Sequence, residues 1–228
     1  MSTADGRKVL LETLKRKSGH KQDVFQNTKE WFYILKKVLQ ECIDELSGQL
    51  GDDRIRFRVE DQGLGEARLY LGSDVLVFHM HSNVFKLPPT DYATQTSYVK
   101  NKPENAYCGI INVYDFLADS YEQNRPNDLG YLICRIFVNK EDHFKVEGKG
   151  PLGIAYQNYM NQVLTEEILH ELILRIGIYA LDFDLLTPPY QAVSTVSVEE
   201  LQTLSSHSKL RTGKRLGFRF HSDNKIQG

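Results

Sequence analysis

The sequence has no long hydrophobic run and few cysteines, and each absence argues against a class of protein. No stretch approaches the roughly 18 consecutive apolar residues of a membrane-spanning helix, and the first six residues are small and polar, unlike a secretory signal. Cys42, Cys108 and Cys134 lie far apart and form no CxxC pair, which argues against a disulfide framework or a thiolate zinc site. We therefore expect three buried thiols in a cytoplasmic protein with no membrane partner.

Complete catalytic motifs are also missing. There is no GxSxG sequence around a serine, and the HExxH pattern fails because Leu174 stands where the second histidine is needed. The segment 148–153 fits GxGxxG, but the polar, alternating residues 143–147 before it are unlike the apolar strand of a dinucleotide fold. We expect no cofactor, and the sequence leaves open whether the chain is an enzyme.

Charge is distributed unevenly along a chain whose formal net charge is only −2. Residues 1–21 carry six basic and two acidic side chains, and residues 207–228 carry six basic and one acidic, whereas the body is acidic. We expect a basic N-terminal segment (1–22), one domain (23–206) and a basic C-terminal segment (207–228). The C-terminal run predicts a nucleic-acid contact through Lys209, Arg211, Lys214 and Arg215, or else a basic edge that only discourages aggregation.

Apolar residues recur every three or four positions from Val24 to Leu46, the spacing of an amphipathic helix. Asp23 is suited to cap its start and Gly48 to stop it, so we predict a helix over 24–47. Such a helix is longer than one core face needs. It could pack along a whole sheet, or share its apolar stripe with a second copy in a homodimer.

From about residue 54 the apolar period changes from four to two, the alternation of half-buried strands. The closely spaced strands, joined by glycine-rich turns, indicate an antiparallel meander. We predict an α+β fold: an antiparallel sheet of about five to six strands, the long N-terminal helix and C-terminal helices packed on it. The strands are expected at 53–60, 67–71, 75–81, 107–114, 131–138 and 143–147, and the C-terminal helices at 154–164 and 165–176.

Residues 86–106 interrupt this regularity with proline, asparagine and aspartate. A loop of about 20 residues within a domain is uncommon and often functional, so it is either a lid or a structured excursion. Tyr92 and Tyr98 in this segment are candidate ligand-binding residues. Lys149 is a third, because it stands among glycines whose free N–H groups could bind an anion.

His79 and His81 are two residues apart on a predicted strand, so their side chains share one face of the sheet. Two adjacent imidazoles can bind zinc, iron or copper if a third ligand converges on them. The alternative is a strand end where half-buried histidines meet solvent. We therefore keep three hypotheses: a non-catalytic, self-associating module that binds a small ligand or a protein, a metal-dependent enzyme centred on these histidines, and a nucleic-acid accessory protein.

Overall fold

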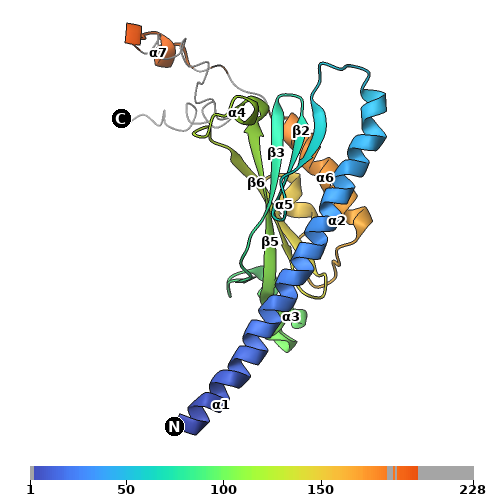
Figure 1. The fold of residues 1–228 in the computed structure, drawn as a ribbon, viewed down its shortest axis with the longest axis vertical. Coiled ribbons are helices and arrows are strands. Elements are labelled where there is room, and N and C mark those ends of the chain that lie inside the picture. The colour runs from blue at the N-terminus through green and yellow to red at the C-terminus, as the bar shows by residue number, and fades with distance from the viewer. Residues whose placement is uncertain (1–2, 184–186, 188, 200–228) are drawn as a thin grey trace.

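The computed structural model describes residues 3–183, 187 and 189–199 and begins with one long helical rod. α1 (Thr3–Thr13), a π-helical turn (Leu14–Ser18) and α2 (Gly19–Leu50) follow one another without a break (Figure 1). The predicted start after Asp23 was wrong because residues 7–22 are mostly good helix formers and contain no proline. The predicted stop at Gly48 was also wrong, since α2 continues to Leu50 and is capped by Gly51, whose φ of 65° is left-handed.

A seven-stranded antiparallel sheet forms the centre of the molecule and confirms the predicted α+β class, with one strand more than expected. Each main strand pairs with its neighbours in the sequence, and the two-residue β4 pairs with the first two residues of β5. In sequence order the strands are β1 (Phe57–Asp61), β2 (Glu66–Leu71), β3 (Asp74–Met80), β4 (Phe85–Lys86), β5 (Tyr107–Leu117), β6 (Tyr131–Val138) and β7 (Phe144–Gly148).

The shorter helices show which of the two predictions for residues 86–106, a lid or a structured excursion, is correct. Residues 87–106, called the excursion below, form a structured unit and no open lid, with η2 (Tyr92–Gln95), α3 (Ser97–Asn101) and η3 (Pro103–Ala106) in succession. The other helices are α4 (Ala118–Glu122), α5 (Pro151–Ala155), α6 (Glu166–Leu181) and α7 (Tyr190–Val193). None of the described helices is long and apolar enough to cross a membrane.

The predicted helix over 154–164 was wrong, whereas the one after Thr165 was confirmed. The first prediction failed because Tyr159 turns inward and is fully buried, donating its hydroxyl to the Asn105 carbonyl at 2.7 Å. The second helix, α6, begins as expected, with the Thr165 side chain accepting from the backbone N–H of Ile168 at 3.3 Å.

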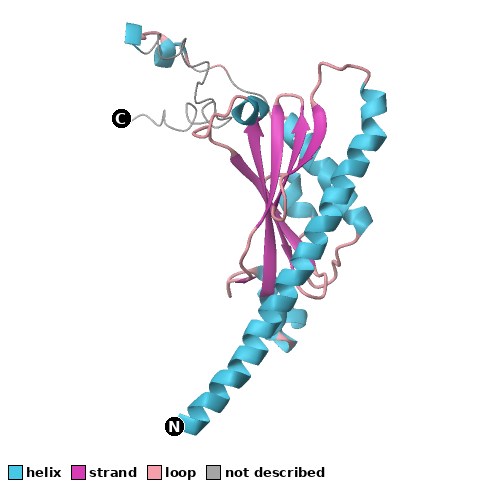
Figure 2. Ribbon diagram, viewed as in Figure 1, coloured by secondary structure: helices cyan, strands magenta, loops and turns pink. Residues whose placement is uncertain are grey.

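The two longest helices of the body lie on one face of the sheet, which we call the covered face (Figure 2). α2 and α6 pack there on the inward side chains of the strands, and together they enclose the main hydrophobic core, which includes Phe32, Leu76, Phe78 and Ile111. α2 approaches β5 so closely that a Cβ on Gly109 would lie 2.0 Å from the Thr28 hydroxyl. Only glycine allows this crossing.

The opposite face, called the open face, carries two smaller apolar clusters. One lies under the excursion and includes Cys108, Ile110 and Tyr159. The other lies at the opposite end of the strands under α4 and includes Val75 and Val77. No helix spans the distance between them in the part of the chain that the structure describes.

Candidate ligand groove on the open face

A groove of about 750 Å³ occupies the open face beside the excursion, a volume within the usual range for small-molecule sites. Its floor comes from β5, β6 and β7, and its walls come from the end of β3, from β4 and from the start of the excursion. The lining residues are His81, Phe85, Lys86, Leu87, Pro88, Thr90, Asp91, Tyr92, Ile110, Asn112, Tyr114, Leu132, Arg135, Phe137, Lys145, Glu147 and Gln157.

Strand periodicity explains which side chains form the floor. Ile110, Asn112 and Tyr114 alternate along β5 with residues that face the main core. On β6 the alternation is interrupted by a bulge, because the register with β5 shifts between Val113 and Tyr114. The shift places both Leu132 and Arg135, three residues apart, on the open face.

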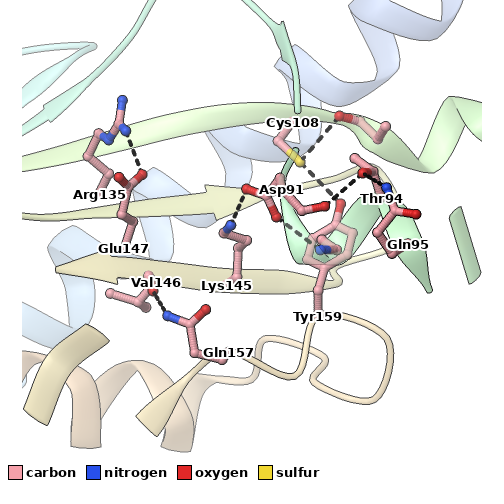
Figure 3. Close-up of polar contacts among 12 residues, drawn as sticks. Asp91, Thr94, Gln95, Cys108, Arg135, Lys145, Val146, Glu147, Gln157 and Tyr159 are labelled. Carbon is pink, nitrogen blue, oxygen red and sulfur yellow. Dashed lines mark hydrogen bonds and ion pairs between the residues drawn. The ribbon is translucent and has the colours of Figure 1, made fainter. Parts of the chain in front are cut away.

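Lys145 and Asp91 join the excursion to the sheet through a largely buried ion pair (Figure 3). The two side chains are only 9% and 16% exposed. The other oxygen of Asp91 accepts from the backbone N–H of Ala93 at 3.0 Å and so caps η2. One carboxylate therefore fixes both the local turn and its position over β7.

A second ion pair lies on the floor, where Arg135 donates to Glu147 on the neighbouring strand at 2.5 Å (Figure 3). The guanidinium also lies 5.3 Å from the centre of the Phe137 ring, and the Lys145 ammonium lies 5.5 Å from the same ring. Both distances suit cation–π contacts. The floor thus combines an aromatic surface with two neutralised ion pairs.

A polar row crosses the sheet beside these apolar residues. Successive strands place these residues directly opposite one another: Glu66, His79, Asn112, Arg135 and Glu147. The centre of the row is Asn112, which is 9% exposed and lines the groove. Its side chain forms no hydrogen bond within the described residues. Because Asn112 lines the groove and its amide is not used by the protein, it is a candidate contact for a ligand.

His81 presents a donor to the groove. Its Nδ1 accepts from the backbone N–H of Asn83 at 3.0 Å, so the proton of the neutral imidazole is on Nε2. The Phe85 ring packs edge-on against the imidazole with centroids 4.7 Å apart and fixes its orientation. In this tautomer neither nitrogen offers a free lone pair to a metal ion.

The structure confirms that His79 and His81 share a face but brings only His81 into the groove. His79 is exposed and lies beside Asn112. Among the residues that the structure describes, no group of three His, Cys, Asp or Glu side chains is arranged to hold a metal ion. The metal-dependent enzyme stays a prediction.

Of the three predicted ligand-binding residues, too, only one lines the groove. Tyr92 lines the groove wall and is 71% exposed. Tyr98 instead lies within the excursion, where it stacks on His143 with ring centroids 4.1 Å apart and donates to Glu141 at 2.7 Å. Lys149 lies 5.7 Å from the centre of the Tyr131 ring and does not line the groove. Tyr98 therefore supports the excursion from inside.

The remaining candidates are the basic C-terminal residues and the cysteines. Lys209, Arg211, Lys214 and Arg215 lie outside the described residues, so the nucleic-acid contact stays a prediction. All three cysteines are free and buried, as expected. The Cys108 thiol lies 3.1 Å from the Tyr159 hydroxyl, and burial raises the pKa of Cys108 to about 12. A thiol with such a high pKa is a poor nucleophile near neutral pH.

The sequence-based reasoning missed the main polar groups of the groove: Asp91, Asn112, Arg135 and Lys145. A signal for two of them was present. Asn112 and Arg135 each interrupt a run of apolar residues within a buried strand. A polar residue in such a strand is either paired with a partner or available to one. Asp91 and Lys145 had no such signal, because they are 54 positions apart.

Comparisons with protein families, with curated proteins and with solved structures found no match to this chain.

Proposed function

We propose that this chain is a non-catalytic binding module and that the groove on the open face of the sheet takes a small ligand. The observation that carries the proposal is the unpartnered amide of Asn112 on the floor of a groove of about 750 Å³. Around it, Ile110, Leu132 and Phe137 offer apolar surface. The groove thus offers apolar surface beside polar groups, a combination that small-molecule sites use for affinity and orientation.

The pairing of the charged groups favours binding over catalysis. Asp91 is bonded to Lys145 and Glu147 to Arg135, so both carboxylates of the groove are already neutralised. A general base needs a free lone pair within reach of the proton that it removes. These ion pairs instead hold the walls in place, which is a role suited to a preformed binding site.

A direct test uses a neutral aromatic probe, 2-naphthamide, titrated into the full chain and followed by backbone amide NMR shifts. We expect the shifts to concentrate at Ile110, Asn112 and Phe137. The variant Leu132→Trp fills the groove and is expected to remove them, because Leu132 lines the floor. The matched control is Leu129→Trp, since Leu129 is exposed but lies outside the groove. Shifts elsewhere, or equal binding by both variants, would contradict the proposal.

Self-association through the long helix is a second part of the proposal. The residues of α2 that face the sheet, including Phe32 and Leu35, are buried within the chain itself. The densest group of exposed apolar residues in the rod lies near its N-terminal end, where Leu10, Leu11 and Leu14 are 59%, 57% and 49% exposed. α1 extends past the end of the sheet (Figure 1). We therefore place the contact on residues 3–18.

Sedimentation velocity over a range of concentrations tests this second part. We expect a dimer that is lost in Leu10→Gln/Leu14→Gln, because polar side chains remove the apolar contact. The control Leu64→Gln changes an exposed leucine in the turn between β1 and β2 and is expected to leave the dimer intact. A strict monomer at high concentration would contradict self-association and leave the groove proposal untouched.

A further inference from the structure

If the groove is a ligand site, the class of ligand follows from the polar groups that the protein leaves free. The Asn112 amide has two N–H donors, and its side chain has no partner among the described residues. His81 adds a third donor at Nε2, because its Nδ1 is occupied by the Asn83 N–H. The free groups of the two side chains are therefore three N–H donors and one acceptor, the Asn112 carbonyl oxygen. This excess of donors favours a ligand group that is rich in oxygen lone pairs.

These donors lie close enough to act on one group. Asn112 is directly opposite His79 in the sheet, and the His81 backbone N–H donates to the Ile110 carbonyl at 2.8 Å. Asn112 and His81 are therefore diagonal neighbours on one face, a relation that separates side-chain origins by roughly 7–8 Å. The two oxygens of a carboxylate can accept from both, given the length of the two side chains.

The charges of the groove favour the same kind of ligand. Three cationic side chains, Lys86, Arg135 and Lys145, line it against two carboxylates, Asp91 and Glu147. Both carboxylates are bonded to cations, so a cationic ligand has to compete with an existing partner. Lys86 has no ion-pair partner within the described chain. An anion therefore meets a net positive site in which one ammonium, that of Lys86, has only the Tyr107 ring at 5.7 Å as a partner.

The remaining lining residues are suited to the apolar part of a ligand. Phe85 and Phe137 present aromatic rings, while Ile110 and Leu132 present aliphatic side chains. Burial of such surface favours binding by roughly 25 cal/mol per Å² before the costs of association. A bare inorganic anion would leave this surface uncovered.

We propose that the groove binds a small organic acid, with its carboxylate held by Asn112 and His81 and its apolar or aromatic body lying over Ile110, Leu132 and Phe137. This proposal rests on the groove being the ligand site. It gives a role to the Asn112 amide, which forms no hydrogen bond within the described residues.

The experiment compares 2-naphthoate with its neutral analogue 2-naphthamide and with the cation 2-naphthylmethylammonium, by calorimetry and by amide NMR shifts on the full chain. We expect the carboxylate to bind at least about tenfold more tightly than the amide, since hydrogen bonds to a charged group are the strong ones. The cation is expected to bind most weakly.

The variant Asn112→Leu gives an independent readout, because leucine has a similar size and no donors. We expect it to lose the preference for the carboxylate while its denaturation midpoint stays close to that of the parent chain, since the amide has no hydrogen bond within the described residues to lose. The control Asn101→Leu changes an exposed asparagine at the end of α3 and is expected to keep the preference.

The outcomes separate the two proposals. Equal binding of 2-naphthoate and 2-naphthamide at the groove, or tighter binding of the cation, would overturn the organic acid and leave the ligand groove standing. Absence of all three probes from the groove would overturn both. A lower denaturation midpoint for Asn112→Leu would overturn the role given to Asn112, because it would show that the amide has a structural partner.

Discussion

The two faces of one sheet differ in how their apolar residues are arranged. On the covered face a single core runs from α2 and α6 across the strands and includes Phe32, Phe78 and Ile111. On the open face the apolar residues form two separate clusters at opposite ends of the strands, with the polar row and the groove beside them. Because the same strands supply both faces, the alternation of side chains lets one sheet combine a stable core with an open site.

The largest expected effect comes from adjacent residues of β3 that point to opposite faces. Phe78 is fully buried in the main core, so Phe78→Ala is expected to lower the free energy of unfolding by about 3–5 kcal/mol. His79→Ala, on the exposed open-face side, is expected to change it by less than about 0.5 kcal/mol. Urea denaturation measures both. Equal losses of unfolding free energy in the two variants would contradict the difference between the two faces.

The ion pair under the excursion is expected to have the next largest effect. Lys145→Met leaves the Asp91 carboxylate largely buried without its cation, which is expected to cost roughly 3 kcal/mol. Asp91→Asn keeps the oxygen that caps η2 and removes the charge. In a double-mutant cycle the pair of substitutions is expected to cost less than the sum of the two single variants. Additive losses would show that the two charges act independently.

The close crossing of α2 over β5 sharpens the comparison on the covered face. Gly109→Ala places a methyl group within 2.0 Å of the Thr28 hydroxyl and is expected to cost about 1–3 kcal/mol. Adding Thr28→Ala should recover part of that loss. Gly48→Ala is the control, since nothing lies within 4 Å of its added methyl group, and in a helix it is expected to stabilise by about 0.5–1 kcal/mol. Denaturation of all four chains measures these effects.

The smallest effect concerns the pH dependence of the excursion. Bonds from Lys102 and Tyr98 lower the pKa of Glu141 below its usual value of 4.5. A lowered pKa in the folded chain contributes stability above the unfolded value, and that stability is lost as the pH falls through the folded value. Below about pH 4.5 we therefore expect amide hydrogen exchange of Val99 and Ala106 to become faster relative to exchange in the central strands β3 and β5.

Glu141→Gln is the control for this pH effect, because glutamine has no carboxylate to protonate. Its exchange rates in the excursion are expected to be faster at pH 7 and to depend less on pH, once corrected for intrinsic exchange. If the parent and the variant respond equally to acid, another group controls the excursion.

The fold was largely predictable from the sequence, because the change from a four-residue to a two-residue apolar period directly reflects burial. The same alternation correctly placed His79 and His81 on one face. The start of the long helix was not predictable in this way. Residues before Asp23 have no apolar stripe that the body buries, and apart from the contacts of Arg16 and His20 with Glu104 they are helical by local preference.

The groove could be predicted only in part, for a physical reason. Its floor follows from strand alternation, but the bulge in β6 moves Leu132 and Arg135 onto one face against the simple two-residue rule. Its wall depends on Asp91 reaching Lys145 across the fold, and nothing local in either segment fixes that contact. Asn112 had a signal, as a polar residue in an apolar strand, but the absence of a partner is visible only in three dimensions.

The strand order also has a consequence for the time course of folding during synthesis. Each main strand pairs with the one made just before it, so the sheet can grow hairpin by hairpin as the chain leaves the ribosome. The rod is made before the sheet and cannot complete its docking until β5 has emerged, because α2 crosses that strand at Gly109. At roughly 5–20 residues per second, the apolar side of α2 has to wait in water for several seconds. The earliest part of the chain is therefore among the last to reach its final place.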